Sequence, residues 1–133
     1  MLLLTGLASY GLLAVRTALG AIFLYHGVPK LKSPKELAGA AGLPMWFAFL
    51  IGLGETVGGI LSLAGFLTEL AAIFLAVVML GALYYKIFKW KAPFSAYNQM
   101  GWEFDLILLA ATLVLIFSGA GSLSVDSVLK IWP

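Results

Sequence analysis

The sequence predicts an all-α integral membrane protein, a bundle of four membrane-spanning helices with a short interfacial helix between the first two. Of its 133 residues, 62% are hydrophobic and 11% are charged, and the mean hydropathy is +1.06. A water-soluble domain of this length has too little interior to bury so much apolar surface. Four apolar runs also match the roughly 20 helical residues that cross a bilayer. They cover approximately residues 8–27, 45–64, 68–88 and 103–119, so residues 1–133 are treated as a single transmembrane domain.

The first apolar run is expected to be a retained helix that ends at Gly27. The opening sequence MLLLTGLASYGLLAVR lacks a basic segment ahead of its apolar core, because its first charged side chain is Arg16. A signal peptide carries its positive charge before that core. Glycine is favoured just after a helix C-terminus, and Pro29 opposes continuation of the helix. The first span is therefore placed at residues 8–27.

The segment SPKE, residues 33–36, has the pattern of a new helix start. Ser33 would be the N-cap, Pro34 the first helical residue and Glu36 the reciprocal partner of a capping box. The helix that follows is too short to span and is expected to lie at the membrane interface. Pro44 then precedes the second span.

Two further stretches separate the remaining spans. In AGFLTEL, Gly65 can end the second span, while Thr68 caps the third and Glu69 occupies its first turn. These two helices should form a tight hairpin. The longest polar stretch is KIFKWKAPFSAYNQMG, residues 86–101, and the fourth span begins after it, at about Trp102.

The basic residues predict how the chain is oriented in the cell membrane. Three lysines lie between the first and second spans, and three more lie at the end of the third span and before the fourth: Lys30, Lys32 and Lys35, then Lys86, Lys89 and Lys91. The positive-inside rule places such loops in the cytoplasm, so both termini are expected outside. An aromatic belt at the cytoplasmic interface would consist of Trp46, Tyr84, Tyr85, Trp90 and Trp102.

Arg16 and Glu55 are the two charged residues placed well inside spans. Each costs roughly 2.5–3.5 kcal/mol at mid-membrane, so each should face a partner or a wet cavity. Both are expected at the same depth on adjacent antiparallel helices, which favours an ion pair between them. That pair could fix helix register, or Glu55 could line a polar pocket and hold or pass a proton. Gly54 and Gly58 form a small-xxx-small pair that would let another backbone approach closely.

A second polar group is expected at the cytoplasmic end, where His26 and Lys30 share a level with Glu103 and Asp105. Carboxylates in the first turn of a helix are favoured by the helix dipole, which is an ordinary reason for the acidic pair. These two residues are about 200° apart around the helix, so one should point inward and the other toward the headgroups. A lone histidine at a helix end is more often a hydrogen-bonded interfacial residue than a ligand. No catalytic residue is assigned.

Composition excludes several classes of site and partner. The chain has no cysteine, which rules out disulfide relays, thiolate metal sites and iron–sulfur clusters within it. His26, Glu103 and Asp105 lack a recognised ligand spacing, so no metal site is expected. The net charge of +2 comes from basic residues that flank spans, and this placement does not indicate nucleic acid binding.

Three motifs resemble the DoxX family of small four-helix membrane proteins. They are RTALGAIFLYHGVPKL at residues 16–31, the glycine-rich GLGETVGGI around Glu55, and GWEFDLILLAATLVL at residues 101–115. The resemblance implies a link to membrane oxidoreductases, because the family is named for subunits associated with terminal quinol oxidase and thiosulfate:quinone oxidoreductase. It supplies no catalytic scheme. The family-like polar positions are Arg16, His26, Gly27, Lys30, Glu55, Glu103 and Asp105.

The favoured function is therefore a quinone- or redox-linked subunit of a membrane oxidoreductase assembly. A quinone would enter from the lipid and place its carbonyls near His26, Lys30 or Glu103. No intrinsic cofactor is expected, so electrons would come from a partner oxidoreductase subunit or a bound cofactor. One alternative is a transporter of protons or a small solute that acts as a homo-oligomer. Another is a non-catalytic membrane anchor for a partner enzyme.

Overall fold

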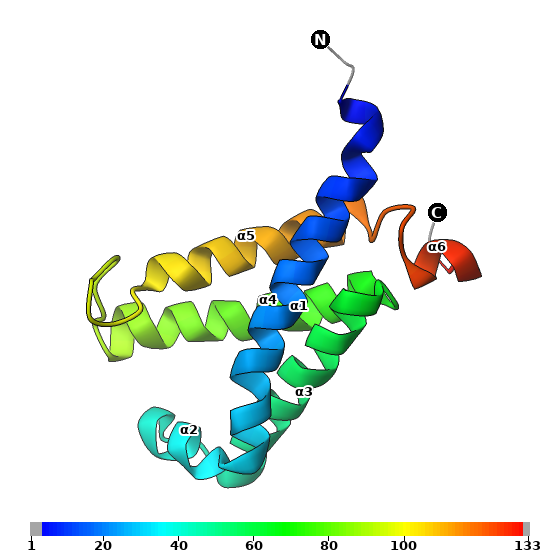
Figure 1. The fold of residues 1–133 in the computed structure, drawn as a ribbon. Helices are drawn as coiled ribbons and strands as arrows, with labels where there is room; N and C mark the ends of the chain where they lie inside the picture. Colours follow the sequence, from blue (N-terminus) through cyan, green and yellow to red (C-terminus); the bar gives the residue numbers. More distant parts are fainter. Residues whose placement is uncertain (1–3, 132–133) are drawn as a thin grey trace.

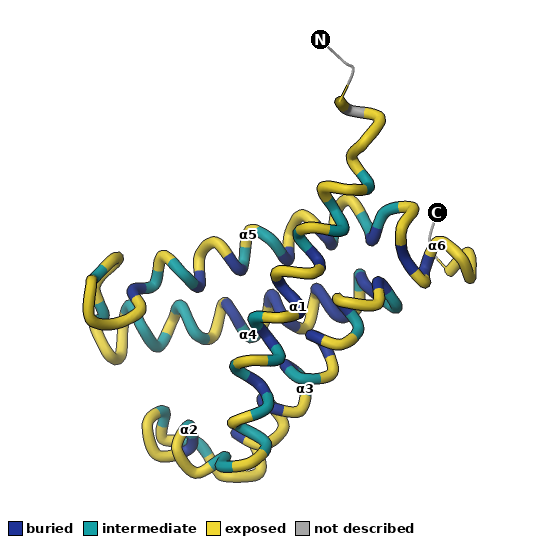
Figure 2. The backbone as a smooth tube through the Cα atoms, viewed as in Figure 1, coloured by how far each residue is buried: buried dark blue, intermediate teal, exposed yellow. Residues whose placement is uncertain are grey.

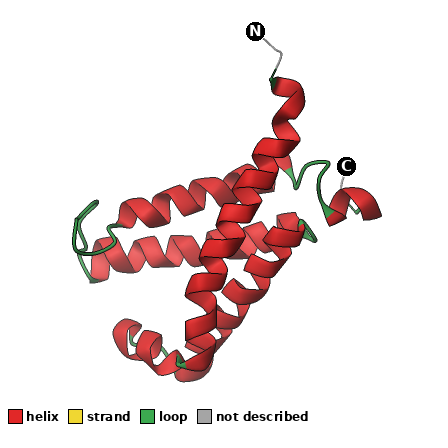
Figure 3. Cartoon of the chain, viewed as in Figure 1, coloured by secondary structure: helices red, strands yellow, loops and turns green. Residues whose placement is uncertain are grey.

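The computed structural model describes residues 4–131, and within them it contains helices and loops but no strand (Figure 3). Three continuous helical segments are long and apolar enough to cross a membrane: Ala8–Lys32, Met45–Ala64 and Thr68–Lys89. The fourth long helix, Trp102–Ser118, has 17 residues. In chain order the elements are η1 (Thr5–Leu7), α1 (Ala8–Lys32), α2 (Pro34–Ala41), α3 (Met45–Ala64), α4 (Thr68–Tyr84), the π-helical turn η2 (Tyr85–Lys89), α5 (Trp102–Ser118) and α6 (Val125–Leu129).

The long helices are arranged as two pairs that meet at one end (Figure 1). Helix α1 packs along α3, and α4 packs along α5. The tight turn between α3 and α4 joins the pairs at the end that also holds α6. The core lies where α1 crosses the second pair, and its buried residues are Leu19, Phe23, Ala72, Leu75, Met79, Leu108 and Leu115.

The outward faces of the helices are largely apolar and exposed, while buried positions gather where helices meet (Figure 2). Val77 on α4, together with Ile107 and Phe117 on α5, are among the large apolar side chains left uncovered. In water such a surface would be strongly unfavourable, whereas lipid chains solvate it well. The exposed faces therefore fit a chain embedded in a bilayer.

The predicted end of the first helix at Gly27 is wrong, because α1 continues through Gly27 and Pro29 to Lys32. Proline inside a helix removes one backbone hydrogen bond, the bond that residue 29 would donate to the Tyr25 carbonyl. Tertiary contacts compensate for this loss. Gly27 is buried against α3, and the Lys30 side chain binds Glu55 there.

Other boundaries follow the sequence more closely. Helix α3 begins and ends where the second span was predicted, and Gly65 ends it in the left-handed conformation with φ of 66°. Helix α2 begins at Pro34, although the Ser33 side chain makes no capping hydrogen bond. Thr68 begins α4 but does not cap it. The carboxylate of Asp126 does so instead, by accepting hydrogen bonds from the backbone N–H groups of Leu67 and Thr68.

Glycines bring α1 and α3 into backbone contact. A Cβ atom at Gly59 would lie 2.9 Å from the Gly20 carbonyl oxygen, and one at Gly27 would lie 2.7 Å from the Thr56 backbone nitrogen. A Cβ atom at Gly52 would lie 2.6 Å from the Lys30 Cβ atom. These distances are shorter than real side chains tolerate. The close α1–α3 contact therefore requires glycine on both helices, as in many membrane helix pairs.

Gly54 and Gly58 were predicted to let another helix backbone approach closely, and this prediction is wrong. The atoms nearest to these two glycines belong to side chains of α4. The Phe74 ring lies where a Gly54 Cβ atom would be, and Leu75 occupies the corresponding space at Gly58. The small-xxx-small pair thus makes room for two large α4 side chains.

We expect Gly27→Ala to destabilise the protein, because the added methyl group collides with the α3 backbone. Overpacking of this kind typically costs about 1–3 kcal/mol. Gly11→Ala is the matched control on the same helix, since nothing lies within 4 Å of a Cβ atom there. Thermal unfolding in detergent should show a lowered midpoint for Gly27→Ala and an unchanged or raised midpoint for Gly11→Ala. Equal midpoints for the two variants would contradict the close packing.

Candidate functional site

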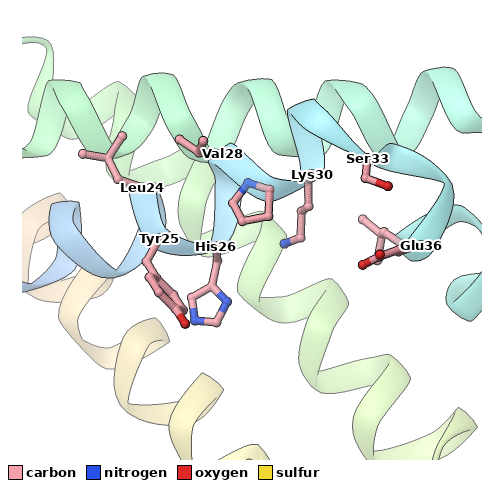
Figure 4. Close-up of a pocket in the computed structure, with 9 residues that line it drawn as sticks. Leu24, Tyr25, His26, Val28, Lys30, Ser33 and Glu36 are labelled. Carbon is pink, nitrogen blue, oxygen red and sulfur yellow. The ribbon is translucent and has the colours of Figure 1, made fainter.

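A groove of about 580 Å³ lies along the last turns of α1 and the start of α2. Figure 4 shows His26 and Lys30 pointing from α1 into the space that α4 and α5 border on the other side. The lining combines aliphatic side chains with several polar groups. It consists of Leu24, Tyr25, His26, Val28, Pro29, Lys30, Ser33, Glu36 and Leu37.

Lys30 forms an ion pair with Glu55 across the α1–α3 contact. The ammonium group donates hydrogen bonds to both carboxylate oxygens, Oε1 at 2.8 Å and Oε2 at 2.6 Å. The Glu55 side chain is 2% exposed, whereas the Lys30 side chain is 25% exposed and also lines the groove. Bidentate binding of a buried carboxylate fixes the Lys30 head group. One N–H of Lys30 is left for a further acceptor.

The structure does not form the ion pair that was predicted between Arg16 and Glu55. Glu55 packs opposite Gly27 on α1. Eleven helical residues separate Gly27 from Arg16, which is about 16 Å along the helix axis. The prediction assumed that α1 ended at Gly27. The added turns up to Lys32 shift the pairing of the two helices, so the two charges lie at different depths.

Arg16 is fully buried at the end where the two helix pairs meet. Its guanidinium donates hydrogen bonds to the carbonyl oxygens of Ser62 at 3.2 Å and Leu63 at 3.3 Å, in the last turn of α3. It also donates to the Leu123 carbonyl, ahead of α6. A cation is favoured at a helix C-terminus, where carbonyl groups lack helical donors. Arg16 therefore joins α1, α3 and the C-terminal segment, with Asp126 nearby as the balancing charge.

A second ion pair links η2 with α5. Lys86 Nζ lies 2.6 Å from Asp105 Oδ2, and both side chains are largely buried. The π-helical turn at Tyr85–Lys89 rotates the end of this helix and includes Lys86. The predicted division of the acidic pair is confirmed, because Asp105 is buried and Glu103 is exposed.

His26 lies between the two helix pairs. Its ring contacts Phe104 of α5, with 5.7 Å between ring centroids, and Tyr25 on its own helix at 5.4 Å. His26 therefore places a polar group of α1 against α5, where the two helix pairs face each other.

The structure thus brings together four of the six candidate residues at the lysine-rich end: His26, Lys30, Glu55 and Asp105. Glu103 points away and Arg16 belongs to the opposite end. Sequence reasoning missed two partners, Lys86 and Asp126. Lys86 was read only as part of a positive loop. Asp126 stood out as the one acidic residue after the last span, which was a usable signal.

The groove can hold a ring-bearing ligand with oxygen substituents. Leu24, Val28 and Leu37 offer an apolar wall, while His26 and Lys30 offer polar contacts. Such a mixture, largely apolar with a few converging polar groups, is typical of small-molecule sites. Within residues 4–131, no three side chains of the His, Cys, Asp and Glu types come close enough to hold a metal ion.

The family model described as DoxX matches residues 11–90, which include the groove and the Lys30–Glu55 pair. The chain belongs to the DoxX family. The matched region ends before α5, so Glu103 and Asp105 lie outside it.

Two curated relatives cover most of this DoxX chain. A Bacillus subtilis (strain 168) protein named "Putative oxidoreductase CatD" is 33% identical over 119 residues, which cover 87% of this chain and 84% of the relative. A Mycobacterium tuberculosis (strain ATCC 25618 / H37Rv) protein named "Uncharacterized membrane protein Rv3486" is 31% identical over 127 residues, which cover 86% and 78%. No solved structure matches the chain significantly.

We expect Glu55→Met or Lys30→Met alone to destabilise the protein by about 3 kcal/mol, because each leaves a charge without its partner. The double variant Lys30→Met with Glu55→Met should recover most of that loss, since no unpaired charge remains. Lys32→Met is the control on the exposed face of α1. Chemical unfolding in mixed micelles measures all four variants. Additive losses in the double variant would argue against the pair.

Proposed function

We propose that this DoxX protein is a quinone-linked subunit of a membrane oxidoreductase assembly. The observation that carries the proposal is the groove beside His26, where a polar end and an apolar wall lie on one exposed surface of a membrane protein. The name of the Bacillus subtilis relative supports an oxidoreductase setting. The subunit would bind and position the quinone and need not be catalytic by itself.

The groove chemistry fits the two halves of a quinone. The ring would pack beside Leu24, Val28 and Leu37, while an oxygen substituent would lie at His26 and Lys30. Lys30 is held by Glu55 and retains one free donor for that oxygen. The isoprenoid tail of a quinone would remain in the lipid, next to the apolar outer faces of the helices. Electrons would pass to or from the quinone through a partner oxidoreductase subunit, with a second copy of the chain as a further assembly partner.

The membrane arrangement we propose has four spanning helices in one bundle. Helix α5 would be the fourth span, since 17 residues rise about 26 Å, close to the thickness of the hydrocarbon core. The short α2 would lie at the cytoplasmic interface. There the Trp90 ring nitrogen donates a hydrogen bond to the Ala40 carbonyl at 3.2 Å, which ties the two lysine-bearing segments together. The start of α1 and α6 lie at the other end, and we place them outside (Figure 1).

We expect the protein purified in mild detergent to retain a quinone, and His26→Leu with Lys30→Met and Glu55→Met to lose it. The first two substitutions remove polar contacts from the groove, and the third leaves no unpaired carboxylate that would destabilise the protein. Lys32→Met with Lys35→Met is the matched control, since it removes two exposed charges outside the groove lining. Mass spectrometry of the extracted lipids measures quinone per protein.

If no quinone is retained, two further measurements distinguish the alternative functions of transporter and membrane anchor. If neither native protein nor control retains or binds quinone, alone or with its physiological partner, the proposal fails. Flux of protons or a small solute in proteoliposomes would then indicate a transporter. No flux would leave a membrane anchor.

For orientation, we expect a cysteine at position 127 to react with an impermeant maleimide in intact cells, and a cysteine at position 91 to react only after permeabilisation. The native chain contains no cysteine, so Ser127→Cys and Lys91→Cys each introduce a single reactive site. Both positions are exposed. The reverse labelling pattern would invert the proposed topology.

A further inference from the structure

We propose that the lysine-rich end of the protein binds an anionic phospholipid, such as phosphatidylglycerol, where α2 meets the segment that follows α4. The headgroup would be held by Lys35, Lys89 and Lys91, beside the ring of Trp90. None of these four residues lines the groove next to His26, so this is a second site. Its occupation does not require a quinone.

A hydrogen bond brings the two segments together. The ring nitrogen of Trp90 donates to the Ala40 carbonyl of α2 at 3.2 Å. Lys89 and Lys91 are the chain neighbours of Trp90. Lys35 lies five residues before Ala40, which is about 7.5 Å along the helix axis. Three lysines from two separate segments therefore lie close to one tryptophan side chain.

These three lysines keep their charge without a counterion from the chain. The two ion pairs at this end use other lysines, one in α1 and one in η2. Lys35, Lys89 and Lys91 are exposed and form no ion pair within residues 4–131. Lys89 lies 5.9 Å from the centroid of the Tyr84 ring, and Glu36, the neighbour of Lys35, lines the groove. The end therefore carries positive charge that an external anion can neutralise.

Lys35 and Lys91 also occupy positions where the backbone disfavours lysine. Lys35 is the second residue of α2, where the positive end of the helix dipole opposes a cation. Lys91 follows the π-helical turn with φ of 49°, in the left-handed region that favours glycine. A bound anion would supply a compensating interaction at both positions.

Exposed aromatic side chains indicate that the anion belongs to a lipid. Phe88 and Phe94 flank the lysines in sequence and are 66% and 51% exposed, and Trp90 is 46% exposed. Aromatic rings beside lysines are typical of the membrane interface, where the rings contact lipid chains and the ammonium groups reach the headgroups. Basic clusters at this level recognise anionic lipid headgroups. The segment thus offers contacts to both parts of a phospholipid.

The bound lipid would also join the two helix pairs. Helix α2 packs on α1 and α3, whereas Lys91 follows the helix that packs on α5. In the described part of the chain, a single hydrogen bond, from Trp90 to Ala40, links the pairs at the lysine-rich end. A headgroup held by Lys35 and Lys91 would add a second link.

Native mass spectrometry of the purified protein in neutral detergent tests this site, with phosphatidylglycerol and phosphatidylcholine of equal chain length titrated separately. We expect phosphatidylglycerol to bind at least about tenfold more tightly, since each lysine near an anionic headgroup contributes about fivefold in affinity. Lys91→Gly should weaken phosphatidylglycerol binding about fivefold, and Lys35→Gln with Lys91→Gly should lose most of the preference. Glycine suits the backbone at position 91, so folding is retained.

Lys130→Gly is the matched control. Lys130 is also an exposed lysine with a positive φ, 54°, but it ends α6 at the opposite end of the molecule (Figure 1). We expect this variant to bind both lipids as the native protein does.

Three results would overturn the inference. Equal native affinities for the two lipids would leave the lysines to an acidic partner protein. Equal losses in Lys91→Gly and Lys130→Gly would indicate an effect of net charge alone. Displacement of phosphatidylglycerol by an equal concentration of inorganic phosphate would reassign the site to a free anion.

Discussion

The close contact of α1 with α3 is the constraint on which the rest of this structure depends. Without glycine at positions 20, 27, 52 and 59, the two backbones could not approach as they do. The contact sets the register between the helices, and the register decides which charges meet. It brings Lys30 to Glu55 and leaves Arg16 at the opposite end. An ion pair in a membrane is favourable only when its geometry is good, and here the packing of two helices supplies that geometry.

The polar residues at the two ends of the molecule have different roles. At one end, Arg16 and Asp126 satisfy the ends of α3 and α4 and hold the two helix pairs together. At the other end, each pair carries its own ion pair, Lys30–Glu55 or Lys86–Asp105, and His26 contacts α5 between them. At the first end, Arg16 and Asp126 bind backbone groups of the chain. At the second end Lys30 and His26 keep groups directed into a groove, so this end is where a ligand can be recognised.

Much of the fold could be predicted because it depends on local composition and on the proline and glycine residues that mark helix ends. The second span was predicted at the residues that α3 occupies, since Pro44 and Gly65 mark its ends without help from other helices. The first helix was predicted too short for the opposite reason. Gly27 and Pro29 look like a stop locally, yet Gly27 is required for contact with α3, and that contact keeps the helix going.

The polar site was predictable only in part. His26, Lys30 and Asp105 were expected at one membrane level, and the structure places them at the lysine-rich end, where Glu55 and Lys86 are the partners in the two ion pairs. Which cation binds Glu55 depends on helix register, and an error of five residues in the length of α1 was enough to select the wrong one. Asp126 could be singled out in the sequence as the one acidic residue after the last predicted span, but its contact with a turn about 60 positions earlier in the chain could not be predicted.

Binding of a quinone-type ligand in the groove between α1 and α2 can be tested by photolabelling with an azidoquinone, followed by peptide mapping. We expect the label to fall within residues 24–37 and to be displaced by unlabelled quinone. A displaceable label on the outer face of α3 and α4, around Gly54 and Phe74, would contradict it, and so would the absence of any displaceable label.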